Sequence, residues 1–317
     1  MPVAAQSSAP LKVSIALSSF SIAQALSFLA VDGGFFQREN LDVTLIDART
    51  GAGAIQAVLS GSVQFATGNV DSALNATAQG KRIYVPLRLY SGQPGYLVIS
   101  KKFAGASKVD TKAPLMDRLK ALKGATLASP SLGSTYTVFL KKAAEVAGAN
   151  IAITYLASEG MVAALTTGNI DGMIVSSPYA EVAVAQGAGV VWIDGPKGEF
   201  PGTRADDFVI PLSVPEPYAV ANPAVVERVI RAYIAASNFV KSKPREARAT
   251  IRNRFPNQDD ALFALMWERN VPAFQNVIPD VDALRRAQEQ ATGTFAQQIK
   301  ALDPNSMLLT DIVKKAR

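Results

Sequence analysis

The fold is decided by the first continuous run of secondary-structure signals, which reads LKVSIALSSFSIAQALSFLAVDGGFFQRENLDVTLIDARTGAGAIQAVLSGSVQFATGNV at residues 11–70. Its apolar pattern predicts buried strands at 11–17, 41–46 and 63–66, and each strand is followed by a small polar loop and an apolar helix. Repeated strand–loop–helix units of this kind predict a mainly parallel sheet.

The same pattern returns in the middle of the chain and predicts a second α/β lobe. Strands are expected at 125–128, 151–155 and 172–175, with helices between them. Residues 57–65 (AVLSGSVQF) resemble residues 164–172 (ALTTGNIDG), because each is a helix end, a glycine and the start of a strand. Any protein built of βα units repeats this order of helix end, glycine and strand start, so the similarity does not by itself establish a duplication.

The last third of the chain predicts a return to the first lobe followed by helices. Residues 195–204 are rich in Gly and Pro and read as a crossing linker. Strands are expected at 208–212 and 218–221, and helices at 223–241, 244–254, 259–270, 281–299 and after Thr310. We therefore expect a discontinuous lobe 1 at 11–90 and 209–317, which includes the C-terminal helices, and an inserted lobe 2 at 91–208.

Composition excludes several kinds of chemistry. The 317 residues include no Cys and no His, so thiol nucleophiles, disulfides, Cys/His zinc sites and Ser-His-Asp systems are all ruled out. A dinucleotide fingerprint starting at Gly51 fails because its third glycine would be Gln56. We expect no cofactor, no metal and no catalytic residue. The alternative is a carboxylate-based hydrolase or lyase that uses Glu159 and Asp207.

The charge balance fits a small anionic ligand or a negatively charged partner equally well, and its distribution does not favour a nucleic acid. The chain has 32 basic and 26 acidic residues, a net charge of +6, and the basic residues are spread along its length. No stretch approaches the ~20 apolar residues that a membrane span requires. The first ten residues are small and polar, like the spacer after a cleaved export signal, and we expect the signal itself to be missing from this sequence.

Small polar residues gather where predicted strands end and helices begin. Such positions combine unpaired backbone N–H groups with the positive end of a helix dipole, which favours anions. Ligands of open α/β sheets bind outside these strand ends. Each residue alone is more often an ordinary helix cap or a core side chain, and the recurrence of the pattern in both lobes favours a site. The expected donors and helix-end contacts are Ser19, Thr50, Asn69, Ser134, Thr135 and Ser176.

Aromatic and charged residues would complete this candidate site. Phe20, Tyr90 and Tyr136 would supply the walls for an organic ligand. Arg49, beside the predicted helix start at Thr50 and Gly51, would neutralise its charge, ahead of Arg88 and Arg204. The set of candidate ligand-binding residues also includes Gly51 and Asp207.

Several segments together resemble one known family. They are residues 22–41 with DGGFF at 32–36, residues 57–65, Leu122-Lys123-Gly124 before a strand, Gly133-Ser134 before a helix, and residues 163–172. The chain resembles the solute-binding proteins of the sulfonate, nitrate and taurine type together with the thiamine-pyrimidine binders, the NMT1-like group. The similarity spans about residues 11–218 and is weaker over the C-terminal helices.

This resemblance implies a periplasmic-binding-protein fold of type II, in which two α/β lobes are joined by two crossing strands. It implies a non-catalytic, monomeric solute-binding component of an ABC importer, which captures a small organic anion in an interlobe cleft by hinge closure. The expected partners are the ligand and the transporter permease, with no nucleic acid and no membrane contact except through the permease. The expected location is the periplasm or the cell surface. Related thiamine-precursor synthases and porphobilinogen deaminases depend on His or Cys residues that this chain lacks.

Overall fold

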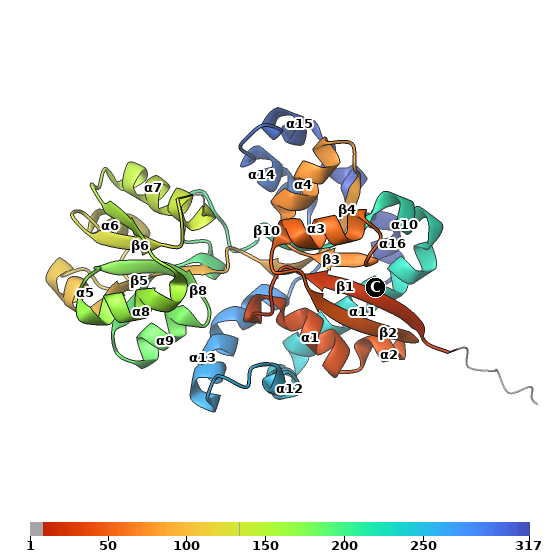
Figure 1. Ribbon diagram of the computed structural model, residues 1–317, viewed down its shortest axis with the longest axis horizontal. Helices are drawn as coiled ribbons and strands as arrows, with labels where there is room; N and C mark the ends of the chain where they lie inside the picture. The colour runs from red at the N-terminus through yellow and green to blue at the C-terminus, as the bar shows by residue number, and fades with distance from the viewer. Residues whose placement is uncertain (1–8, 133) are drawn as a thin grey trace, which may run out of the picture. The chain divides into compact units, whose positions relative to one another are not determined.

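The computed structural model describes residues 9–132 and 134–317, so the expectations that concern residues 1–8 and Gly133 lie outside it. The chain forms two compact units (Figure 1). Unit 1 contains the chain up to Ser91 together with Phe208–Phe255 and Phe274–Arg317, and unit 2 contains Gly92–Asp207 and Pro256–Ala273. Residues 256–273, which the sequence placed with lobe 1, therefore group with the second unit.

Unit 1 is built on a five-stranded mixed sheet. Its strand order is β2-β1-β3-β10-β4, in which β1, β2 and β3 are parallel and β10 is antiparallel to both of its neighbours. The strands are β1 (Leu11–Leu17), β2 (Leu41–Asp47), β3 (Phe65–Thr67), β4 (Ile83–Ser91) and β10 (Phe208–Pro215). The three predicted parallel strands are thus present and adjacent.

Helices cover both faces of this sheet (Figure 1). On one side, α3 (Gly51–Leu59) and α4 (Val70–Ala78) pack with α14 (Val281–Glu289) and α15 (Ala296–Ala301) around a core that includes Ala16, Ile55 and Leu74. On the other side lie α1 (Ala25–Asp32), α2 (Phe35–Arg38) and the long helix α11 (Pro223–Ser242). The ring of Phe36 meets Tyr233 of α11 edge-on at 5.3 Å.

Unit 2 repeats the arrangement with the strand order β7-β6-β8-β5-β9. Its strands are β5 (Gly95–Ser100), β6 (Thr126–Ser129), β7 (Ala152–Tyr155), β8 (Gly172–Ser176) and β9 (Gly189–Asp194). Alternate side chains of β5 enter two different cores, because successive strand residues point to opposite faces. Leu97 and Ile99 pack with α6 (Leu115–Lys120) and α7 (Thr135–Ala147), and Tyr96 and Val98 pack with α8 (Ser158–Thr167) and α9 (Tyr179–Ala185).

The C-terminal region is helical, as predicted, with two local corrections. The expected strand at 218–221 is wrong, because Glu216–Ala221 form helix α10; an acidic residue and Pro217 in its first turn favour a helix start. The expected helix at 281–299 is broken into α14 and α15, with Gly293 between them in the left-handed conformation (φ +88°). Helices α12 (Pro244–Thr250) and α13 (Asp260–Asn270) lie between α11 and α14, and α16 (Thr310–Lys315) is the last helix of the chain.

Contacts with α9 place the helix α13 in unit 2. The two helices pack together, and the side chain of Asn270 donates a hydrogen bond to Ser177, just before α9. Among residues 9–132 and 134–317, no helix combines the length and the apolar character needed to cross a membrane.

Candidate functional site

The ends of three parallel strands lie level with one another in unit 1. Leu17, the last residue of β1, is in register with Asp47 of β2 and with Thr67 of β3. Backbone hydrogen bonds continue past the strands, since Ser18 N–H donates to Thr67 O at 2.9 Å and Ala48 N–H donates to Leu17 O at 2.8 Å. The loops that carry Ser19, Thr50 and Asn69 therefore all start from one edge of the sheet.

A buried glutamine holds two of these loops together. Gln24 is 2% exposed; its Nε2 donates to Ser18 Oγ at 3.1 Å, and its Oε1 accepts from Thr67 Oγ1 at 2.6 Å. Ser19 Oγ lies 2.9 Å from Ser21 Oγ in the same loop. This role of Gln24 could not be predicted from the sequence, because a glutamine within an apolar helix carries no local signal for a contact between strands.

Glycines let the start of α3 lie against the start of α4. A Cβ on Gly68 would lie 3.1 Å from Gly51 Cα, and a Cβ on Gly51 would lie 3.0 Å from Asn69 N. Thr50 caps α3 by accepting from Gly53 N–H at 2.9 Å. The two helix N-termini consequently meet at one place, where their free backbone N–H groups and dipoles add.

Three further candidates of unit 1 are exposed near this edge. Asn69 is the N-cap of α4, but its side chain makes no capping hydrogen bond, so its amide is available to a ligand. Arg49 has a left-handed backbone (φ +63°) fixed by its N–H donating to Asp47 Oδ1 at 2.8 Å. Phe20 is 49% exposed, with its ring 5.4 Å from that of Phe28. An exposed aromatic ring beside polar loops suits contact with an organic molecule.

Two candidates of unit 1 are placed differently. Tyr90 is fully buried, and its ring meets Phe274 edge-on at 5.4 Å, so it belongs to the core of unit 1. Arg88 is 2% exposed, and its Nη2 donates to Asn276 O at 3.3 Å. Both lie on β4, where burial on both faces of the strand leaves little side chain at the surface.

Unit 2 has an equivalent polar edge. The parallel strands β6 and β8 end at Ser129 and Ser176, and Gly95 of β5 pairs with Ser176. Ser134 caps α7 by accepting from Tyr136 N–H at 3.2 Å, and Thr135 is exposed beside it. Three candidates therefore lie at the start of α7: Ser134, Thr135 and Tyr136. The Tyr136 hydroxyl interacts with the Ser176 side chain.

Tyr136 lies over a glycine that leaves room for its ring. A Cβ on Gly95 would lie 2.5 Å from Tyr136 Cε1, so any larger residue there would displace the ring. Desolvation raises the pKa of the Tyr136 hydroxyl to about 12, and the nearby Ser176 hydroxyl partly opposes this rise. The phenol therefore stays neutral at physiological pH and can donate a hydrogen bond.

The loop after β8 is held by a buried hydrogen-bond chain. Asn270 Nδ2 donates to Ser177 Oγ at 3.1 Å, and Ser177 Oγ donates to Glu181 Oε1 at 2.8 Å. Burial raises the pKa of the Glu181 carboxyl, although the hydrogen bond from Ser177 opposes the rise. Neither Asn270 nor Glu181 could be predicted from the sequence, because Asn270 belongs to a helix distant in the chain and Glu181 lies in an otherwise ordinary helix.

The carboxylates of the enzymatic alternative have separate structural roles. Asp207 is 5% exposed, and its Oδ2 accepts from Arg204 N–H at 2.8 Å in a turn. The Arg204 side chain pairs with Asp206 at 2.9 Å. Glu159 is at the start of α8, where its own backbone N–H and the Tyr179 hydroxyl donate to it and lower its pKa. Asp207 is thus part of a buried turn rather than of the polar edge.

Comparison with solved structures shows the fold. The chain is similar to the periplasmic aliphatic sulphonate binding protein SsuA from Escherichia coli, with 17% identity, a TM-score of 0.71, and 96% and 99% of the two chains covered. It is similar to the alkanesulfonate-binding protein SsuA from Xanthomonas axonopodis bound to MOPS, with 16% identity, a TM-score of 0.63, and coverage of 96% and 99%. It is also similar to the nitrate-binding protein NrtA from Synechocystis, with 13% identity, a TM-score of 0.62, and 96% and 88% of the two chains covered. These likenesses confirm the two-lobed periplasmic-binding fold.

The sequence comparisons give the family. No curated protein matches the chain. The sequence model of the NMT1-like family matches residues 8–253, which include the ten strands found among the described residues and the polar loops at their ends. The expectation drawn from the segments at 22–41, 57–65 and 163–172 is thereby confirmed, and the chain belongs to the NMT1-like family.

Proposed function

We propose that this chain is the solute-binding component of an ABC importer and that it captures a small organic anion, a sulfonate or an aromatic carboxylate, without converting it. One observation carries the proposal: the N-termini of α3 and α4 meet at a glycine contact, at an edge where three strands end in register. Two adjacent helix starts supply free N–H donors and positive dipole ends, which favour an anion.

The side chains around this edge favour an organic anion over a simple one. The exposed ring of Phe20 offers apolar contact, and Asn69 has an uncommitted amide. In unit 2, Tyr136 and Ser176 offer a second ring and neutral hydroxyl groups. The residues we propose as ligand contacts are Ser19, Thr50, Gly51 and Asn69 at the edge of unit 1, and Ser134, Thr135, Tyr136 and Ser176 at the edge of unit 2.

Similar proteins support this ligand class. The similar structures are an aliphatic sulphonate binding protein, an alkanesulfonate-binding protein bound to MOPS and a nitrate-binding protein, and each of these ligands carries an anionic group. Arg49, which forms no ion pair among the described residues, would add a positive charge near the α3 start. The proposal includes a periplasmic location, a permease as the partner, and action as a monomer.

Ligand-induced stabilisation tests the proposal. The melting temperature of the purified protein should rise saturably with MOPS or with benzoate, because a ligand that binds only the folded state stabilises it. A shift with sodium nitrate alone would indicate a simple-anion site and contradict the organic ligand class. Glycerol serves as the neutral control. Absence of any saturable shift, or conversion of one of these ligands in excess over the protein, would overturn the proposal.

Variants then locate the site. Asn69→Ala and Ser176→Ala should each weaken binding about three- to tenfold, the effect of one lost hydrogen bond of roughly 1 kcal/mol. Asn238→Ala is the matched control, since Asn238 is an exposed asparagine on α11 that is not among the proposed ligand contacts. Equal affinity of all three variants would remove the two polar edges from the binding site.

A further inference from the structure

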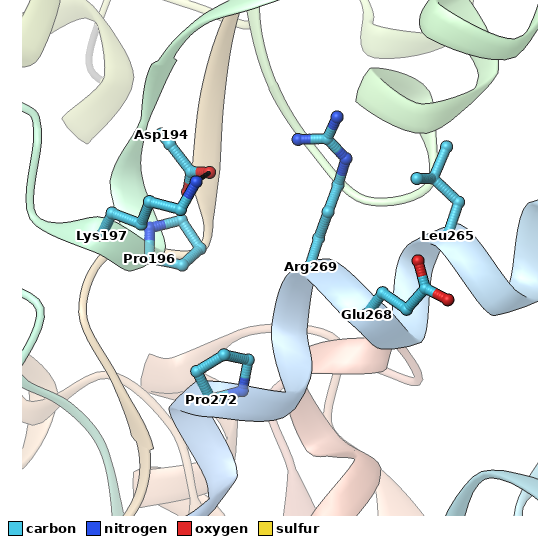
Figure 2. A pocket seen from close by; sticks show the side chains of 7 residues that line it. All are labelled: Asp194, Pro196, Lys197, Leu265, Glu268, Arg269 and Pro272. Carbon is cyan, nitrogen blue, oxygen red and sulfur yellow. Dashed lines mark ion pairs between the residues drawn. The ribbon is translucent and has the colours of Figure 1, made fainter. Parts of the chain in front are cut away.

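A cavity of about 310 Å³ lies within unit 2 and shares no lining residue with the candidate anion site described above. Its walls come from the end of β9 and the following turn on one side, and from α13 and the turn after it on the other (Figure 2). None of the candidate ligand-binding residues lines it. The lining residues are Asp194, Pro196, Lys197, Leu265, Glu268, Arg269 and Pro272.

One wall presents an arginine whose positive charge acts on the buried Glu181 carboxyl, partly opposing the rise in its pKa that burial causes, without an ion pair between the two. Among the described residues, Arg269 forms no ion pair, and its Nε is buried without a hydrogen-bond partner. Its guanidinium lies 5.8 Å from the centre of the Tyr96 ring, which holds the side chain in place. Figure 2 shows the guanidinium extending from α13 into the space opposite Asp194. A guanidinium with free donors is a receptor for a carboxylate.

The opposite wall presents a buried carboxylate. Asp194 is 6% exposed; its Oδ2 pairs with Lys197 Nζ at 3.1 Å, and its Oδ1 has no hydrogen-bond partner among the described residues. A buried carboxylate oxygen without a donor is costly and favours an incoming N–H group. The two walls thus carry complementary requirements, an acceptor that lacks a donor and a donor group that lacks an acceptor.

The remaining lining sets the class of the occupant. Two acidic residues, Asp194 and Glu268, and two basic residues, Lys197 and Arg269, leave the lining with no net charge, so a simple anion or cation would meet as much repulsion as attraction. Prolines and Leu265 supply apolar surface. We propose that this cavity binds a small zwitterion, an α-amino acid with an apolar side chain, whose carboxylate pairs with Arg269 and whose ammonium group pairs with Asp194.

The cavity also touches segments that lead out of unit 2. Lys197 precedes the stretch that enters unit 1 at Phe208, and Pro272 stands just before the return of the chain to unit 1 at Phe274. An occupant that joins the two walls would link these two segments. The site would therefore act in addition to the anion site, and it does not rest on the proposed function.

A ligand-deletion series tests the zwitterion directly. L-valine, 3-methylbutanoate and 2-methylpropylamine share an apolar branched chain, and the last two each lack one charged group. In a titration of the ¹⁵N-labelled full chain followed by NMR, L-valine should shift amide signals of residues 194–197 and 265–272. The two fragments should bind at least about tenfold more weakly, since each loses a charge-assisted contact. Equal binding of 3-methylbutanoate would make the cavity a simple anion site and overturn the proposal, as would shifts confined to unit 1.

Two variants identify the charged contacts. Arg269→Gln and Asp194→Asn should each weaken L-valine binding about tenfold or more and keep the dispersed amide spectrum of the folded protein. Arg285→Gln, an exposed arginine on α14 of unit 1, is the matched control and should bind L-valine as the native chain does. Unchanged affinity of both cavity variants would place valine elsewhere. The deletion series on the native chain decides the matter if a variant fails to fold.

Discussion

The side-chain amide of Asn270 donates to the hydroxyl of Ser177 at 3.1 Å, although 93 residues separate them in the chain. The same amide also donates to Met266 O at 2.8 Å within α13. A helix from the C-terminal region therefore fixes the loop that follows β8, next to the candidate ligand residue Ser176. Because Asn270 and Ser177 are both almost fully buried, neither group could turn to water if the bond were lost.

We expect Asn270→Ala to destabilise the protein by about 1–3 kcal/mol, because it leaves the buried Ser177–Glu181 pair without its third member. Urea unfolding measures the change. Asn238→Ala on the exposed face of α11 should change the stability by less than about 0.5 kcal/mol. Equal stability of the two variants would show that the Asn270 bond does not support the loop.

Substitutions of Thr50 should mainly lower the stability of the protein, whereas substitution of Asn69 should mainly weaken ligand binding. Thr50→Ala should cost about 1 kcal/mol of stability because it removes the cap on Gly53 N–H, and Thr50→Ser should retain most of that stability. Asn69→Ala should cost less than Thr50→Ala, because the Asn69 side chain makes no capping bond, and it should weaken ligand binding instead. Denaturant unfolding and ligand titration of the three variants distinguish the two roles.

Gly95→Ala should destabilise unit 2 by about 1–3 kcal/mol, because the new Cβ would overlap the Tyr136 ring. The double variant Gly95→Ala with Tyr136→Leu should recover part of the loss. Gly160→Ala is the control: nothing lies within 4 Å of a Cβ there, and within α8 the change should stabilise by roughly 0.5–1 kcal/mol. Thermal unfolding compares the variants.

Arg49→Gly should raise stability and lower anion affinity at the same time. The left-handed backbone at Arg49 suits glycine, which should stabilise the protein by about 1 kcal/mol, whereas the loss of the guanidinium removes a positive charge near the α3 start. Lys108→Gly relieves the same backbone conformation in unit 2 and should leave anion binding unchanged. Unchanged affinity of Arg49→Gly would exclude Arg49 from the site.

The ion pair between Glu199 and Arg118 should make stability depend on pH. Burial acts to raise the pKa of Glu199, but hydrogen bonds from Arg118 and from Asp194 N–H outweigh it, so the pKa lies below its ordinary value of 4.5. A lowered folded-state pKa contributes stability that is fully present above the unfolded-state pKa and is lost as pH falls through the folded-state value.

Glu199→Gln should therefore cost about 1–3 kcal/mol at pH 7, and the difference from the native chain should shrink as the pH falls below about 4.3. Urea unfolding at pH 7, 5 and 3.5 measures it. Glu145→Gln is the matched control, because Glu145 and its ion-pair partner Lys142 are both exposed. This substitution should lower the free energy of unfolding by less than about 0.5 kcal/mol at any of these pH values. A constant difference across the series would contradict the assignment.

Local patterns in the sequence predicted most of the fold. Strands β1, β2 and β3 and the helices after them follow from short apolar runs ended by glycines such as Gly61, because burial periodicity and left-handed glycine caps are local properties. The pattern failed at residues 218–221 and 281–299, where a helix start at Glu216-Pro217 and a break at Gly293 outweighed the apolar periodicity.

The strand–loop–helix units, the family and the polar residues at the strand ends follow from the sequence, since each depends on neighbours in the chain. The three-dimensional structure was needed to show that Gly51 lies against Gly68, that Tyr90 is buried, and that α13 packs with unit 2. The same is true of Arg269 facing Asp194 across a cavity. These relationships join residues far apart in sequence, and they depend on how sheets and helices pack, which no local periodicity encodes.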